Sequence, residues 1–255
     1  LYWQLSGKYY VLTTLPVSIS TAFAVAAIPT ISESVRKKET DILNNKINSA
    51  IRITMMISIP AAVGIGVLGD GILKLLFPSY SGGGILLKVG SVSIVFLALA
   101  QITTGMLQGI GKVKIPAIAA LFGVLVKIPL NYIFISIPSI NIVGAVISTI
   151  FCYVVASAID VYFLVKNTSA KLDFMNILIK PGISSLIMGI VCYTFYHIVY
   201  LLSNSNTISV VFAIVIGVIV YFLLLAFIRG INKNDIKLLP MGKKIVVLME
   251  KVNLL

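Results

Sequence analysis

The sequence has few charged residues for its length. Of its 255 residues, 11% are charged and 59% are hydrophobic, whereas soluble domains have about 25% charged and about 45–50% apolar residues. A domain of this size in water needs polar groups over its surface and cannot hide so much apolar side-chain area. The composition therefore excludes a soluble globule and indicates a protein whose solvent is mostly lipid.

Cysteine, histidine and catalytic motifs are also scarce. The two cysteines, Cys152 and Cys192, lie in apolar runs without further Cys or His at ligand spacing, so neither a zinc site nor a disulfide framework is indicated. The single histidine, His197, lies among tyrosines, as in an aromatic belt at a membrane interface. No Ser-His-Asp arrangement or phosphate-binding loop occurs. We expect no enzyme activity, no catalytic residue, no cofactor and no metal site.

Seven apolar runs are long enough to cross a hydrocarbon core of about 30 Å as helices. They cover residues 9–31, 51–69, 85–107, 115–136, 143–165, 182–202 and 209–229. These runs predict an all-α integral membrane protein, a polytopic bundle of seven transmembrane helices.

The remaining segments complete the predicted organisation. Residues 1–202 would form a bundle of six helices, and residues 203–229 would hold the last helix, paired with 182–202. At about 33–50, apolar residues at near-helical spacing predict a separate amphipathic helix on the inner leaflet. Residues 70–84 would form an interfacial turn and a flexible connection, and residues 230–255 a basic tail.

Positive charge is concentrated in alternate connections. Lys and Arg number 20 against 8 Asp and Glu, and most of them follow the first, third, fifth and seventh runs. Because basic loops are retained in the cytoplasm, residue 1 is predicted outside and the C-terminus inside. The charge thus indicates topology and contact with anionic inner-leaflet lipids rather than nucleic acid. An external start at Leu1 without a signal peptide further predicts spans upstream.

Two polar stripes interrupt the apolar runs at membrane depth, where polar groups are costly and usually functional. Lys127 and Asn131 share one helix face in the fourth run, and Gln101, Thr104 and Gln108 share another in the third. Together they are predicted to line one hydrated cavity suited to an anionic ligand. Alternatively, Lys127 snorkels to the interface and the others hold helices together.

Prolines within the runs are a second irregularity. Pro16, Pro29, Pro60 and Pro129 each remove a backbone hydrogen bond and are expected to kink or weaken a helix. Transporters use such breaks where helices move or line cavities. We therefore regard these four positions as candidate kink or gating residues.

Several segments resemble one family of exporters. In residues 14–33, a Leu-Pro pair opens an apolar run that ends in Ile-Pro-Thr-Ile-Ser-Glu. Together with residues 72–78, 104–112 and 127–132, this segment resembles polysaccharide and peptidoglycan-precursor exporters. These are flippases of the stage V sporulation protein B type, in the multidrug/oligosaccharidyl-lipid/polysaccharide (MOP) exporter superfamily.

The resemblance implies a two-lobed, MATE-like transporter of fourteen spans in the bacterial cytoplasmic membrane, of which this chain would be the second lobe. The missing N-terminal lobe would supply the other cavity wall. The substrate would be a lipid-linked sugar precursor of the polyprenyl pyrophosphate type, flipped by alternating access, and the last two spans would offer a groove for its tail. The lipid II branch has Asp-Arg at the outer start of the first helix, where Tyr10 and Val11 stand here and Lys8 is the nearest cation.

Three other functions remain open. A cation-coupled drug antiporter would need an acidic residue at membrane depth, but we expect Asp160, near the inner end of the fifth run, to be exposed at the rim. A membrane scaffold for cell-wall synthesis would tolerate substitutions in the cavity. A membrane glycosyl polymerase would need an acidic or histidine-bearing external loop, and the predicted external loops are short or uncharged.

Overall fold

The computed structural model describes residues 4–25, 28–78, 82–228 and 230, and all regular elements in these ranges are helices. The predicted basic tail at 230–255 lies almost entirely outside the described residues. The α-helices are α1 (Tyr10–Val25), α2 (Ile28–Arg36), α3 (Thr40–Leu76), α4 (Gly84–Gly90), α5 (Val92–Gly109), α6 (Lys114–Ile135), α7 (Ile142–Thr168), α8 (Lys180–Ser203) and α9 (Asn206–Phe227). Two π-helical turns, η1 (Gln4–Tyr9) and η3 (Met175–Ile179), precede α1 and α8.

The all-helical membrane fold is confirmed. In the described part of the chain, six helices are long and apolar enough to cross a membrane: α3, α5, α6, α7, η3 with α8, and α9. Within the expected first span, 9–31, the structure describes the 16-residue α1 and then α2, and residues 26–27 between them lie outside the described residues. Pro29 lies in the first turn of α2, where its missing N–H needs no partner, so it begins a helix rather than kinking one. Pro16, Pro60 and Pro129 lie inside helices, as expected.

The predicted amphipathic helix at 33–50 is wrong as a separate element. Its first residues belong to α2, a turn follows at 37–39, and Thr40 begins α3, which runs for 37 residues through the expected second span and on to Leu76. Buried Leu43, Ile47 and Ile51 continue the apolar face of the span without a helix breaker between them. The expected turn at 70–84 is shorter than predicted, because α3 continues to Leu76 and ends just before Phe77 and Pro78.

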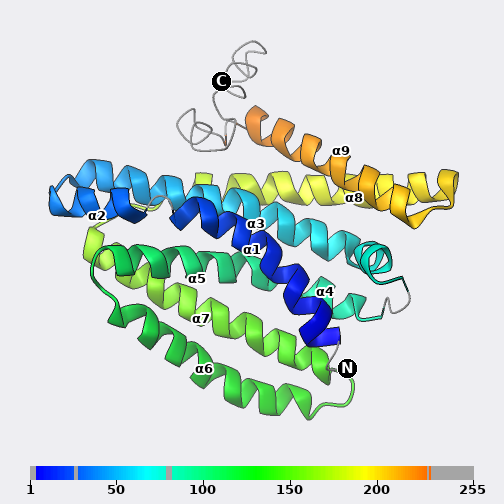
Figure 1. Ribbon diagram of the computed structural model, residues 1–255, viewed down its shortest axis with the longest axis horizontal. Helices are drawn as coiled ribbons and strands as arrows, with labels where there is room; N and C mark the ends of the chain where they lie inside the picture. Colours follow the sequence, from blue (N-terminus) through cyan, green and yellow to red (C-terminus); the bar gives the residue numbers. More distant parts are fainter. Residues whose placement is uncertain (1–3, 26–27, 79–81, 229, 231–255) are drawn as a thin grey trace.

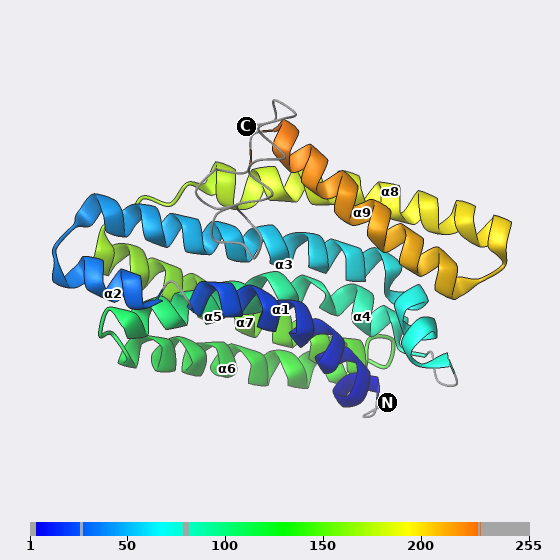
Figure 2. The same ribbon diagram turned by 45° about the horizontal axis from the view of Figure 1, so that its top comes forward.

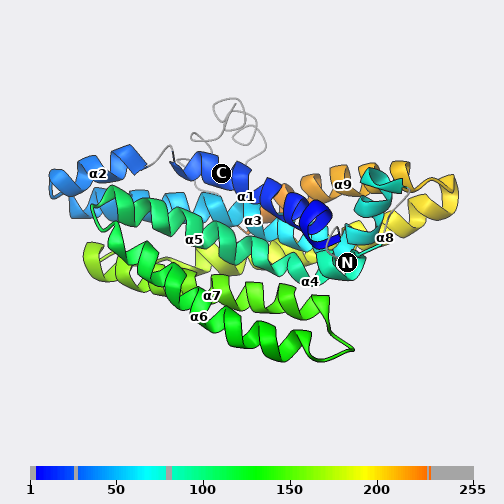
Figure 3. The same ribbon diagram turned by 60° about the horizontal axis from the view of Figure 1, so that its bottom comes forward.

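Helix α3 lies at the centre of the molecule. Figures 1 and 2 show α8 and α9 on one side of it and α5, α7 and α6 on the other, with α1 crossing alongside. Helices α6 and α7 form an outlying hairpin (Figure 3). The buried apolar residues form three clusters, and α3 contributes to each of them. The pairing of the last two spans is seen directly, since α8 packs along α9.

The connections gather at the two ends of the bundle. Residues 37–39, 110–113 and 169–174 lie at the end on the left of Figure 1, which we call the basic end. Residues 77–78, 82–83, 136–141 and 204–205 lie at the opposite end. The basic connections and the connections with little charge, which alternate along the sequence, therefore lie at opposite ends of one bundle.

Candidate transport site

The polar stripe of α6 faces α7 across a close interface. The Ser148 hydroxyl of α7 donates a hydrogen bond to Asn131 Oδ1, and half-buried Lys127 interacts electrostatically with the Cys152 thiol. One turn earlier, a Cβ on Gly123 would lie 2.8 Å from the Cys152 carbonyl oxygen. Glycine at this position lets the two helices approach closely enough for the polar contact to form.

The polar stripe of α5 also contacts α7, but at another height. Thr104 Oγ1 donates a hydrogen bond of 2.9 Å to Asp160 Oδ2, while Gln101 and Gln108 are exposed. Helix α7 lies between α5 and α6 (Figure 1), and at 1.5 Å per residue the contacts at Ser148 and Asp160 are about 18 Å apart along it. The structure thus brings both stripes to α7 and does not bring them together. The three cavities described below contain none of these five stripe residues.

Asp160 is buried, and the expectation of an exposed rim residue is wrong. Its exposed fraction is 2%. Helix α7 continues two further turns to Thr168 and packs along α5, so position 160 lies inside the bundle rather than at its edge. The sequence shows the position along the helix, but only the packing of α5 on α7 decides that the carboxyl is covered.

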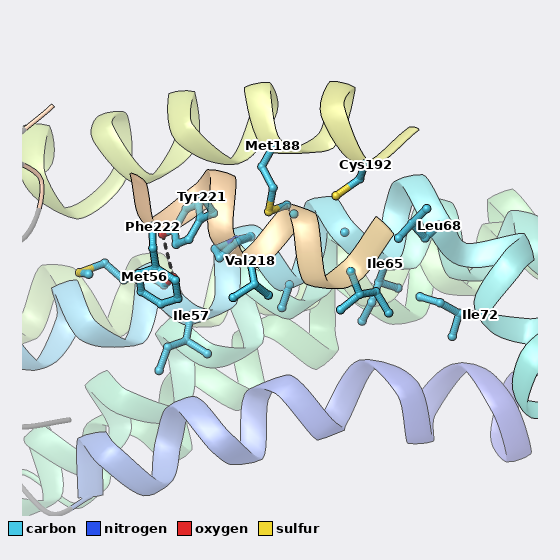
Figure 4. A pocket seen from close by; sticks show the side chains of 15 residues that line it. Met56, Ile57, Ile65, Leu68, Ile72, Met188, Cys192, Val218, Tyr221 and Phe222 are labelled. Atoms are coloured by element: carbon cyan, nitrogen blue, oxygen red, sulfur yellow. Dashed lines mark hydrogen bonds between the residues drawn. The ribbon is translucent and has the colours of Figure 1, made fainter. Parts of the chain in front are cut away.

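An apolar groove opens between α3, α8 and α9 (Figure 4). It has a volume of about 360 Å³, and the residues that line it are Met56, Ile57, Pro60, Ala61, Gly64, Ile65, Leu68, Ile72, Met188, Cys192, Ile214, Gly217, Val218, Tyr221 and Phe222. The polar stripes give no sign of this groove, because its walls are apolar faces of three helices that are far apart in the sequence. The groove was expected on the last two spans, which are α8 and α9. Helix α3 forms a third wall that was not expected.

A proline and a tyrosine shape this groove. Pro60 has no N–H to bond the carbonyl of Met56 one turn earlier. The buried Tyr221 hydroxyl of α9 donates a hydrogen bond of 2.8 Å to that Met56 oxygen, drawn as the dashed line in Figure 4. The carbonyl left without a helical partner is therefore satisfied from a neighbouring helix, which joins α9 to α3 at one edge of the groove.

A polar pocket of about 510 Å³ lies at the basic end, between the start of α3 and residues 171–176. Asn48 Nδ2 donates to the Lys171 carbonyl oxygen at 2.8 Å, and the Lys171 N–H donates to Asn44 Oδ1 at 3.0 Å. The hydrogen bond from the Asn176 side chain lowers the pKa of Asp173, and the charge of Arg52 acts in the same direction. These contacts fix the connection between α7 and α8 against α3.

A second pocket, about 500 Å³, also opens at the basic end. Residues from the α2–α3 turn, the α5–α6 connection and the end of α7 line it, among them Lys38, Glu39, Lys112 and Asn167. Its lining mixes charged, polar and apolar side chains. Both pockets at this end are therefore formed by connections, unlike the groove, which is formed by helix faces.

Lys8, at the opposite end, is a buried cation. Its exposed fraction is 2%, its Nζ donates to the Gly82 carbonyl oxygen at 3.3 Å, and it lies 5.4 Å from the centroid of the Phe77 ring. A cation over an aromatic face is stabilised by the ring quadrupole. Lys8, the cation nearest to Tyr10 and Val11, is therefore buried against Phe77 and Gly82.

Comparison with known proteins places the chain in a family. The family model described as lipid II flippase MurJ matches residues 9–224. The lipid II flippase MurJ of Bacillus subtilis (strain 168) is 31% identical over 183 residues, which are 70% of this chain and 32% of that protein. Stage V sporulation protein B of the same organism is 23% identical over 249 residues, which are 96% of this chain and 47% of that protein.

The fold agrees with a solved structure. The chain titled lipid II flippase MurJ, inward closed conformation, superposes with a TM-score of 0.67 at 21% identity, over 88% of this chain and 46% of that one. The chain spans about half the length, or less, of the relatives it matches. Because the family match extends over most of its residues, the chain belongs to the lipid II flippase MurJ family.

Proposed function

We propose that the complete protein moves a lipid-linked sugar precursor across the bacterial cytoplasmic membrane by alternating access. The observation that carries the proposal is the apolar groove on α3, α8 and α9, in a chain of a flippase family. A polyprenyl pyrophosphate-linked sugar has a long apolar tail and an anionic, hydrated head. A protein that carries it needs an apolar surface for the first and a polar path for the second.

The groove suits the tail. Its lining is almost entirely aliphatic, aromatic and sulfur-bearing, and the hydroxyl of Tyr221 is already engaged by the Met56 carbonyl. A Cβ added to Gly64, on its wall, would meet nothing within 4 Å. An open apolar wall of this kind binds a hydrocarbon chain through dispersion contacts without stranding a polar group.

The polar path would use the two stripes and the first lobe. Gln101 and Gln108 are exposed on α5, and Lys127 is partly exposed on α6, so their polar atoms can face water in a cavity completed by the other lobe. Thr104 and Asn131, bonded to α7, would hold the walls in place. The orientation follows the charge, with the basic end in the cytoplasm near anionic lipid headgroups and residue 1 outside. Pro16, Pro60 and Pro129 would be points of bending, and Pro29 would help to begin α2.

The experiment fills the groove. Gly64→Leu places a side chain into its open wall, and Gly182→Leu is the matched control, because a Cβ at Gly182 also meets nothing within 4 Å but lies outside the groove. In the complete protein, we expect Gly64→Leu to lose most of its precursor export at unchanged expression, while Gly182→Leu keeps it. Lys127→Ala should reduce export as well. Export unchanged by Gly64→Leu would remove the groove from the mechanism.

The other functions are less well supported. A scaffold has no need of an open apolar groove. Buried Asp160 supplies the acidic residue that a cation-coupled drug antiporter would need, so the antiporter is set aside on the family and not on the lack of a carboxyl. Neither alternative is favoured by the family to which the chain belongs.

A further inference from the structure

The carboxyl of Asp160 occupies an unusual position between α5 and α7. It is 2% exposed, and its Oδ2 accepts the hydrogen bond of 2.9 Å from Thr104. Its Oδ1 is buried and has no hydrogen-bond donor among the described residues. An ionised carboxylate has about four lone-pair sites that can accept hydrogen bonds. Among the described residues, only Thr104 donates to the Asp160 carboxyl.

No countercharge compensates this carboxyl in the described part of the chain. Helix α5 carries no charged residue. On α6, Lys127 interacts with Cys152, about two turns of α7 away, and Lys114 is exposed at the basic end. On α4, Lys88 is paired with Asp70 of α3, and on α7 itself Lys166 lies 5.9 Å from the Tyr162 ring centroid.

The remaining charged residues of α3 interact with groups other than Asp160 or lie at the ends of the helix. Lys46 donates to the Thr30 carbonyl oxygen and to Ser34 of α2, and Arg52 lines the polar pocket with Asp173. Asp41 and Lys74 lie in the first and last turns of α3. No ion pair of the described residues includes Asp160.

A buried anion without a partner is far costlier than a buried neutral group with one unmade hydrogen bond. The neutral carboxylic acid keeps the bond from Thr104 and removes the charge. We propose that Asp160 is a proton-binding site, occupied in this conformation and emptied when α5 and α7 separate enough to admit water. The proton leaves from a carboxyl oxygen to that water, so the charged form belongs to the hydrated conformation.

The role of this site in a cycle rests on the proposed flippase function, but occupation by a proton does not. If conformations with α5 and α7 packed and parted alternate during transport, each cycle binds and releases one proton at Asp160. The rate of export would then depend on pH through this carboxyl.

The test is infrared spectroscopy of the complete purified protein at neutral pH, where exposed carboxyl groups are ionised. The C=O stretch of a protonated carboxylic acid is separate from the carboxylate bands. We expect such a band in the unmodified protein, its loss in Asp160→Asn, and its return at a shifted frequency in Asp160→Glu. Asp70→Asn, which removes an exposed, ion-paired carboxyl, should leave the band unchanged.

The outcomes separate this proposal from the proposed function. A spectrum in which Asp160→Asn removes no protonated-carboxyl band overturns the proton site, even if the protein exports its precursor normally. A carboxylate band at Asp160 that shifts on adding sodium also overturns it, in favour of a metal cation. A band lost in Asp160→Asn, in a protein that moves no lipid-linked sugar, supports the proton site and contradicts the flippase. Asp160→Glu keeps the test decisive if Asp160→Asn fails to fold.

Discussion

Helices α3 and α6 have almost the same mean hydropathy but opposite surroundings. Over their most apolar windows the values are 1.9 for α3 and 2.0 for α6, yet 56% of the α3 window is buried inside the protein and only 11% of the α6 window. Helix α3 contributes to all three apolar clusters, whereas α6 packs mainly on α7.

The difference shows what hydropathy measures in a membrane protein. Lipid is as apolar as a leucine side chain, so an apolar helix gains no hydrophobic free energy by moving from lipid into the bundle. Its position is decided by shape, by small residues and by polar contacts. Helix α3 has glycines where α4 and α8 approach, and α6 has one polar stripe, turned toward α7.

The largest expected effect comes from the same substitution on the two helices. Leu73→Ala removes a side chain that is 1% exposed on α3, and Leu125→Ala removes one that is 53% exposed on α6. Leu73→Ala should cost about 2–5 kcal/mol because it leaves a cavity, while Leu125→Ala should cost much less. Thermal unfolding in detergent measures both. Equal losses would mean that the outer face of α6 is as closely packed as α3.

A smaller effect should follow from separating α6 from α7. A Cβ on Gly144 would lie 2.5 Å from Phe134 Cβ and 2.8 Å from its carbonyl carbon. Gly144→Val should therefore destabilise the hairpin, by about 1–3 kcal/mol, and cross-linking of cysteines placed on α6 and α7 should fall. Gly182→Val is the control, since its Cβ meets nothing within 4 Å. Unchanged cross-linking in Gly144→Val would show that α6 has another anchor.

The smallest effect belongs to an exposed ion pair at the end of α2, which serves as a reference for the two membrane helices. Lys37 Nζ lies 2.7 Å from Glu33 Oε1, and this hydrogen bond lowers the pKa of Glu33. The pair therefore stabilises the fold above the ordinary pKa of Glu, and the contribution is lost as the pH falls through the lowered value. Lys37→Gln should raise the pKa of Glu33 in an NMR titration, with Lys38→Gln as control. An unmoved pKa would mean that the pair does not persist in solution.

The sequence predicted the membrane helices well and their boundaries at the basic end poorly. Apolar length identifies a span, but it does not say where a helix continues into water. Leu43 and Ile47 read as the apolar face of a surface helix, and they are instead the first buried turns of α3, because α2 and α5 cover them. Pro29 lies in the first turn of α2, although we expected a kink inside a span.

The candidate site residues remain a prediction, and their arrangement in space did not follow from the sequence. Helical spacing grouped Lys127 with Asn131, and in the structure both lie toward α7, while their role in binding substrate stays a prediction. The prediction that Asp160 lies at the rim was wrong. The position of a residue along its own helix does not show whether a neighbouring helix, here α5, packs over it. The resemblance implied a groove on the last two spans, but no pattern in the sequence showed that α3 forms its third wall, since the lining residues lie as far apart as Met56 and Phe222.

The sequence by itself determined that this chain is a helical membrane protein, which ends of the helices carry positive charge, and to which family it is similar. Those properties depend on composition and local order, because each helix satisfies its own backbone in lipid. Only the tertiary structure decided that α3 is central and α6 peripheral, that Tyr221 bonds the carbonyl freed by Pro60, and that Asp160 is enclosed by α5. Such contacts join residues distant in the chain, and in lipid they depend on shape and hydrogen bonding rather than on hydrophobicity.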